Sequence, residues 1–124
     1  MPVKPLTAQS LNALCTRIDF ARNGVIHSLS PLSATSIEIR FSVQDKARGF
    51  DWIDISFVIE GVYDARLLSD NALKMVSMDE GITVEVDHAK AAFAIGDYKG
   101  RIEDAPLYII GSTIGYEERE FGEC

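Results

Sequence analysis

No stretch of this sequence stays apolar for long. The longest apolar runs, such as "AAFAI" and "LYII", end after a few residues, whereas a helix needs about 20 apolar residues to cross a bilayer. The N-terminal "MPVKPLTAQS" also lacks the apolar stretch of a secretory signal. We therefore expect no membrane span and a cytoplasmic protein.

Cysteine and histidine are scarce, with two residues of each. Cys124 is the last residue, and Cys15 lies on the apolar side of an expected helix, so we predict a buried, reduced thiol at Cys15 rather than a disulfide or a nucleophile. His27 lies within an apolar strand and His88 in a turn. Because neither has a Cys or a second His at metal-ligand spacing, we predict structural or solvated histidines, no metal and no other cofactor.

Motifs of catalysis are missing as well. The glycines form no phosphate-binding pattern or nucleophile elbow, and "DNALKMVSMDEG" lacks the alternating carboxylates of a calcium loop. On a strand, Asp51 and Asp54 point to opposite faces, while Asp54 and Glu60 share a face but lie roughly 20 Å apart, too far to flank one scissile bond. We therefore predict no catalytic residues and no enzyme, since an active site would have to be assembled from residues distant in the sequence.

Positive charge is in deficit. The formal net charge is −7, and it divides into +3 for residues 1–50 and −10 for residues 51–124. Binding to nucleic acid needs clustered cations, so the balance argues against nucleic acid and favours a basic protein partner or metal ions. Mild acidity also serves solubility in many proteins, and composition leaves that alternative open.

Apolar residues (47%) and charged residues (25%) are present in ordinary globular proportions, and 124 residues suit a single domain. Thr7 is a suitable N-cap for a first helix. A stripe of apolar residues follows at helical spacing: Leu11, Leu14, Cys15 and Ile18. The segment from Leu67 to Met78 favours one or two further helical turns.

The rest of the chain alternates between apolar and polar residues, as strands do. "TSIEIRFSVQD" and "DWIDISFVIEG" predict an antiparallel pair. "VIHSL" predicts a short strand ending near Ser30-Pro31, "ITVEVD" and "AAFAIG" a hairpin around residues 87–90, and "LYIIGSTIGYEERE" one last strand. The sum is a single α+β domain over residues 1–124, with a curved, mainly antiparallel sheet of about six strands, a roll or partial barrel, and an N-terminal helix packed on it. Residues 117–124 are expected as an acidic C-terminal tail that can be flexible.

One face of the strand "DWIDISFVIEG" is expected to point to solvent. Its outward residues are Asp54, Ser56, Val58 and Glu60. A single outward valine among polar neighbours suits a contact surface, although it is also compatible with an incidental exposed valine or with a second layer over that face. Together with Glu117 and Glu118, these residues are the predicted contacts for a basic protein.

A homodimer is the alternative to a basic partner. Four residues of the expected last strand alternate on the face opposite Ile109: Tyr108, Ile110, Ile114 and Tyr116. Such an apolar face offers a contact to a symmetry mate. A third alternative is a small-ligand-binding or enzyme domain with a pocket in the curved sheet, holding His27 or a tyrosine beside converging carboxylates.

The succession "IDFARNGVIHSL", "SIEIRFSVQD", "WIDISFVIEGVYDARL" and "PLYIIGSTIGYEE" resembles small bacterial domains of the YxiG-like type and some immunity proteins of polymorphic toxin systems. Those families often open with an Asp-Phe-His-Asp-like turn. Here Asp19-Phe20 is followed by Ala21-Arg22, so no role is carried over for the missing His and second Asp. The resemblance implies a β-rich fold and a protein-binding function, such as an acidic immunity protein that inhibits a basic toxin.

Overall fold

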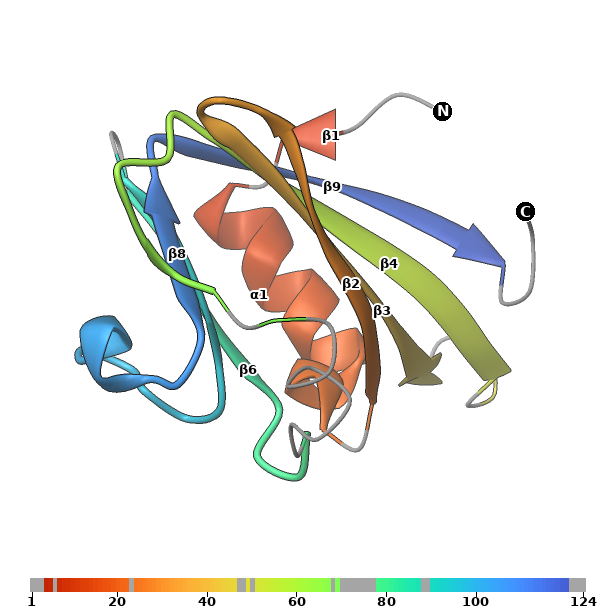
Figure 1. Ribbon diagram of the computed structural model, residues 1–124. Helices are drawn as coiled ribbons and strands as arrows, with labels where there is room; N and C mark the ends of the chain where they lie inside the picture. Colours follow the sequence, from red (N-terminus) through yellow and green to blue (C-terminus); the bar gives the residue numbers. More distant parts are fainter. Residues whose placement is uncertain are drawn as a thin grey trace.

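Two antiparallel β-sheets and a helix form the part of the chain that the computed structural model describes, which is residues 4–5, 7–22, 24–46, 49, 51–67, 69, 78–87 and 90–120 (Figure 1). The helical segments are α1 (Ala8–Arg17) and the short turns η1 (Asp19–Ala21) and η3 (Ile102–Asp104). The strands are β1 (Lys4–Pro5), β2 (Val25–Ser33), β3 (Ser36–Asp45), β4 (Asp51–Glu60), β5 (Asp64–Arg66), β6 (Ile82–Val86), β7 (Ala91–Ile95), β8 (Tyr108–Gly111) and β9 (Thr113–Glu120).

The strands are divided between the two sheets. A five-stranded sheet has the order β1-β9-β4-β3-β2, and a four-stranded sheet has the order β5-β8-β7-β6. The predicted α+β class with mainly antiparallel strands is confirmed, but the described strands form two sheets instead of one, and neither of these sheets is closed.

The N-terminal helix begins where its capping residue predicts. The hydroxyl of Thr7 accepts from the Ser10 backbone N–H (3.1 Å), and the Ser10 hydroxyl accepts from the Thr7 backbone N–H (2.8 Å), which forms a capping box. Leu14, Cys15 and Ile18 are buried, which confirms the apolar stripe. Figure 1 shows α1 between the two sheets, where this stripe joins the main core.

β3 and β4 form the predicted antiparallel pair, with ten residues of each strand in register. β2 pairs with the other side of β3 and runs to Ser33. The prediction that this strand ends near Ser30-Pro31 was therefore wrong. Proline is compatible with β2 because, in the described part of the chain, β2 is an edge strand, in which alternate backbone groups have no partner strand.

The main core lies between the sheets and is centred on three phenylalanines. The rings of Phe41 and Phe57 are 5.3 Å apart, and those of Phe57 and Phe93 are 5.8 Å apart, with all three side chains almost fully buried. A second, smaller cluster covers the other face of the four-stranded sheet, where the segment around η3 packs on small and apolar side chains: Ala92, Ala94, Ile102, Ala105, Tyr108 and Ile110.

The expected last strand is two strands. β8 ends at Gly111 in one sheet and β9 begins at Thr113 in the other, so the chain turns a corner at Ser112. The Ser112 backbone N–H donates to the Glu60 carbonyl (2.9 Å), and a Cβ on Gly111 would lie 2.6 Å from that same oxygen. Only glycine fits this close approach.

Part of the expected acidic tail belongs to the sheet, because residues 117–120 lie in β9 and pair with β4. Residues 121–124 lie outside the described part of the chain. The β6–β7 hairpin is confirmed by its register, from Ile82 opposite Ile95 to Val86 opposite Ala91. The helical turns expected between Leu67 and Met78 fall largely outside the described residues.

The central phenylalanine provides a test of this core. We expect Phe57→Ala to lower the free energy of unfolding by about 3–5 kcal/mol, because it leaves a cavity between the two sheets. The matched control is Leu32→Ala, since Leu32 is 55% exposed and its loss should change stability by less than about 0.5 kcal/mol. Chemical denaturation of both variants measures the difference. Equal losses would contradict the position of the core.

Candidate functional site

The outer face of the five-stranded sheet, which points away from the core, carries most of the predicted contact residues. On β4 the side chains of Ile53, Ile55, Phe57 and Ile59 are buried in the core. The alternate residues therefore point outward: Trp52, Asp54, Ser56, Val58 and Glu60. The sequence pattern thus identified correctly which residues of this strand share the outer face.

The strand register brings further acidic residues onto the same face. Glu38 on β3 lies opposite Val58, and Glu117 on β9 lies opposite Ser56. Neighbouring strands are about 4.8 Å apart, so these residues and the outward carboxylates of β4 occupy one surface. We call Glu38, Asp54, Glu60 and Glu117 the acidic face. Two arginines occupy outward register positions on the same surface, Arg40 opposite Ser56 on β3 and Arg119 opposite Asp54 on β9, and four carboxylates against two arginines leave an excess of negative charge.

Exposure differs among the predicted contact residues. Glu60 is exposed, and Asp54 and Glu117 are half-buried. Ser56 and Val58 are each only 8% exposed, so Val58 lies on the outward face as predicted, but the alternative of an incidental exposed valine is contradicted. Both side chains are short and lie beside longer ones on β3, where the stems of Arg40 and Glu38 can cover them.

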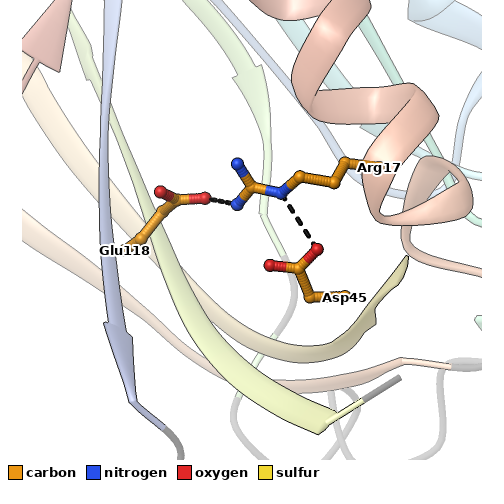
Figure 2. A network of polar contacts seen from close by, with 3 residues as sticks. All are labelled: Arg17, Asp45 and Glu118. Atoms are coloured by element: carbon orange, nitrogen blue, oxygen red, sulfur yellow. Dashed lines mark ion pairs between the residues drawn. The ribbon is translucent and has the colours of Figure 1, made fainter. Parts of the chain in front are cut away.

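Glu118 does not belong to this surface. It lies opposite Ile55 in the register and so points to the inner side of the sheet. Figure 2 shows Glu118 and Asp45 on either side of the Arg17 guanidinium. Arg17 Nε lies 3.0 Å from Asp45 Oδ1, and the Asp45 side chain is 1% exposed. These ion pairs join the end of α1 to β3 and β9, so Glu118 holds the fold together and is not an outward contact.

A chain of hydrogen bonds crosses three strands of the outer face. The Ser42 hydroxyl donates to Asp54 Oδ1 (2.5 Å), and His27 Nε2 lies 2.6 Å from the same hydroxyl oxygen. Since the hydroxyl proton goes to Asp54, His27 Nε2 carries a proton and donates. His27 is the extra residue of a bulge, because the register shifts between Ile26 and Ser28.

His27, Ser42 and Asp54 are the residue types of a hydrolytic triad, but their hydrogen bonds connect them in a different order. In a triad the histidine lies between serine and carboxylate and accepts the serine proton. Here Ser42 lies in the middle, donates directly to Asp54 and is 1% exposed. A substrate has no access to the Ser42 oxygen. These hydrogen bonds therefore hold β2, β3 and β4 together and do not form an activated nucleophile.

The sequence showed no metal-ligand partner for His27, and in the structure its partner is the Ser42 hydroxyl. The sequence pattern places both Ser42 and Asp54 on the outward faces of two strands predicted to pair, and the strand register then shows that they lie directly opposite each other. The bulge that turns His27 toward them has no signal in the alternation of "VIHSL".

The four residues proposed for a homodimer do not form one face. Tyr108 and Ile110 lie on β8 and belong to the cluster beneath η3, whereas Ile114 and Tyr116 lie on β9 and contact the main core. Tyr108, Ile110 and Ile114 are at most 7% exposed, and the Tyr108 hydroxyl donates to Asp64 (3.1 Å). That dimer face is contradicted, because the corner at Ser112 sends the two halves of the segment into different sheets.

Two groups that could act in catalysis are held in their neutral forms. Burial raises the pKa of the Cys15 thiol to about 11. Burial and the hydrogen bond to Asp64 raise the pKa of the Tyr108 phenol above its usual value. Cys15 is free and buried, which confirms its expected state. A protonated, buried thiol is a poor nucleophile at neutral pH.

A pocket of about 420 Å³ lies between α1 and β6, and neither His27 nor a tyrosine lines it. It therefore differs from the ligand site considered from the sequence. Within the described residues, no three His, Cys, Asp or Glu side chains come together as a metal site. In the same part of the chain, no helix has the length and apolar character needed to cross a membrane.

The Arg17 ion pairs predict a measurable loss of stability. We expect Arg17→Gln to lower the free energy of unfolding by about 1–3 kcal/mol, because the buried Asp45 carboxylate loses a charged donor. Arg22→Gln is the control, since the Arg22–Asp19 pair has the same chemistry but is exposed and should contribute less than about 1 kcal/mol. If thermal or urea denaturation finds equal losses, Arg17 does not have this structural role.

Burial of Cys15 predicts an unreactive thiol. In a Cys124→Ser variant, which removes the other cysteine, we expect no reaction with Ellman's reagent in the native state at neutral pH and full reaction in denaturant. The reasons are the raised pKa and the 3% exposure of Cys15. Rapid labelling of the folded protein would show that the thiol is accessible and reactive.

Comparison with known proteins adds no assignment. The chain matches no family model, no curated protein and no solved structure. The case for a function therefore depends on the geometry of the surfaces described above.

Proposed function

We propose that this chain is a non-enzymatic protein-binding domain whose acidic face binds a basic partner. The observation that supports this most directly is the strand register, which places Glu38, Asp54, Glu60 and Glu117 on one surface. These residues come from three adjacent strands and are separated in sequence, so an ordinary acidic composition would not by itself gather them. A surface of this charge attracts cationic proteins and speeds their encounter.

An aromatic anchor lies at one end of the same face. Trp52 points outward beside Asp54, lies opposite Gln44, and is 38% exposed. Tryptophan is enriched among the residues that contribute most to protein interfaces. Charge around a partly exposed tryptophan is an arrangement suited to binding a protein surface.

The chemistry of the polar groups also favours binding over catalysis. Ser42 is inaccessible, Cys15 is protonated, and Tyr108 is hydrogen-bonded to Asp64. The acidic residues of the face are spread over three strands. The proposed partner class is therefore a basic protein, and the resemblance to immunity proteins suggests inhibition of a basic toxin as the role of such a surface.

Charge reversal on the acidic face tests the proposal. Immobilised protein should retain a basic protein from the lysate of its source organism, and Glu38→Lys/Glu60→Lys should lose it. The control is Glu103→Lys/Asp104→Lys, which makes the same change in net charge at exposed residues of η3. For a partner captured in this way, we expect the face variant to lower the association rate constant at least about tenfold, and added salt to reduce the wild-type rate.

Equal retention by the two charge-reversed variants would show that net charge alone is responsible and would refute a specific acidic face. Capture of no basic protein by the wild-type chain would count against the proposal in the same way. Both charge-reversed variants should first be shown to unfold at the same denaturant concentration as the wild type.

A further inference from the structure

A second surface lies along the open edge of the four-stranded sheet. Among the residues that the structure describes, β6 is the last strand of that sheet and pairs only with β7. The pocket beside it is lined by four consecutive β6 residues, from Ile82 to Glu85. Ile82 and Val84 face the core, whereas Thr83 and Glu85 face the other side. Because it contacts both sets, the pocket follows the edge of the strand rather than one of its faces.

The backbone of β6 presents hydrogen-bonding groups to this pocket. The Gly96 N–H donates to the Gly81 carbonyl, and the Asp87 N–H donates to the Lys90 carbonyl, both at 2.8 Å. In an antiparallel ladder the residues bonded to the partner strand alternate, so the odd-numbered residues of β6 bond β7. The N–H and C=O groups of Ile82, Val84 and Val86 consequently point to the open edge. Such an edge is a template for an added strand.

The opposite wall of the pocket comes from the helical segment and is mainly apolar. Leu11, Cys15 and the polar Asn12 of α1 line it, and Phe20 of η1 lies at the same pocket with 41% of its surface exposed. The groove therefore has a hydrogen-bonding side along β6 and an apolar side along α1. This pairing suits an extended peptide whose alternate side chains enter the pocket.

Phe20 is held at this wall by an unusual backbone. Asp19, Phe20 and Ala21 all have left-handed φ values, of 53°, 54° and 60°, a conformation that is unfavourable for residues with a side chain. The turn packs closely on the start of β6, since a Cβ on Gly81 would lie 2.1 Å from the Phe20 carbonyl oxygen. The turn thus fixes the exposed ring beside the groove instead of burying it.

The charged residues around the groove indicate which kind of peptide it can bind. Arg22 is paired with Asp19 (2.7 Å). The other charged residues lining the pocket are Glu80, Glu85, Asp97 and Lys99. Three carboxylates against one ammonium leave a negative rim, which favours lysine or arginine side chains on the incoming segment.

We propose that the open edge of β6 binds an extended basic segment of another protein as an added β-strand. Apolar side chains of the segment enter the pocket between α1 and β6, and its cationic side chains reach Glu80, Glu85 and Asp97. This surface is separate from the acidic face, so the proposal does not depend on the function proposed above.

A synthetic probe tests strand addition directly. The probe is a short, end-capped peptide of alternating valine and lysine, titrated into the isotope-labelled chain. We expect the backbone amides of Ile82, Val84 and Val86 to exchange with solvent at least about tenfold more slowly in its presence, because they become hydrogen-bonded. The amides of Thr83 and Glu85 already bond β7 and serve as internal controls that should change little.

Two altered peptides separate strand addition from other modes of binding. A peptide with N-methylated backbone amides keeps its side chains but loses its donors, so it should not bind. A peptide with glutamate in place of lysine should also fail, because the rim is acidic. Binding of the N-methylated peptide with unchanged affinity, or binding without protection of the three edge amides, would overturn the proposal in favour of simple side-chain capture.

Variants of the chain locate the site. Glu85→Lys should weaken the valine-lysine peptide about fivefold or more, since it reverses a charge at the rim. Glu103→Lys makes the same charge change at η3 and should leave the affinity unchanged. Glu60→Lys, on the acidic face, should also leave it unchanged, so failure of one proposal can be told apart from failure of the other. Equal weakening by all three variants would show non-specific attraction and would refute a site at β6.

Discussion

The pairing of ten residues of β3 with ten residues of β4 determines which side chains of this sheet lie in the core and which lie on its outer face. Side chains alternate along each strand, so this register buries Phe41 and Phe57 and places Ser42 and Asp54 on the opposite surface. A slip of one residue would exchange the two sets. β2 and β9 add to this pair in the same sheet and extend both the core and the outer face.

The least exposed polar side chains of the sheet are used to hold it together. Ser42 connects β2 to β4 through His27 and Asp54, and Asp45 connects the end of β3 to α1 through Arg17. A buried polar group is costly unless it has a partner, and these partners are supplied by adjacent elements. Groups bound in this way stabilise the fold and are poorly placed for reaction, which leaves the exposed and half-buried carboxylates as the functional candidates.

The two proposed binding surfaces have different physical bases. The acidic face depends on side-chain charge collected by the register of β3, β4 and β9. The edge of β6 depends on backbone groups that no neighbouring strand uses in the described part of the chain, next to an apolar wall from α1 and η1. The first surface favours long-range attraction of a basic protein, and the second favours short-range binding of an extended segment.

The sequence alone determined the features that depend on local periodicity and capping. Thr7 started α1, the apolar stripe through Leu14 and Ile18 defined its buried side, and alternation correctly divided β4 into an inner and an outer face. These follow from the repeats of helix and strand, which any short segment contains in full. The same reasoning established the α+β class and the antiparallel β6–β7 hairpin.

Only the tertiary structure decided which distant residues meet. It divided "LYIIGSTIGYEERE" between two sheets. The chain turns at Ser112, where Gly111 closely approaches the Glu60 carbonyl, and no local sequence pattern specifies this turn. It turned Glu118 inward to Arg17 and brought His27 to Ser42 through a bulge. Register, sheet order and bulges depend on contacts between segments far apart in the chain, and a single sequence states the periodicity of each segment but not its neighbour.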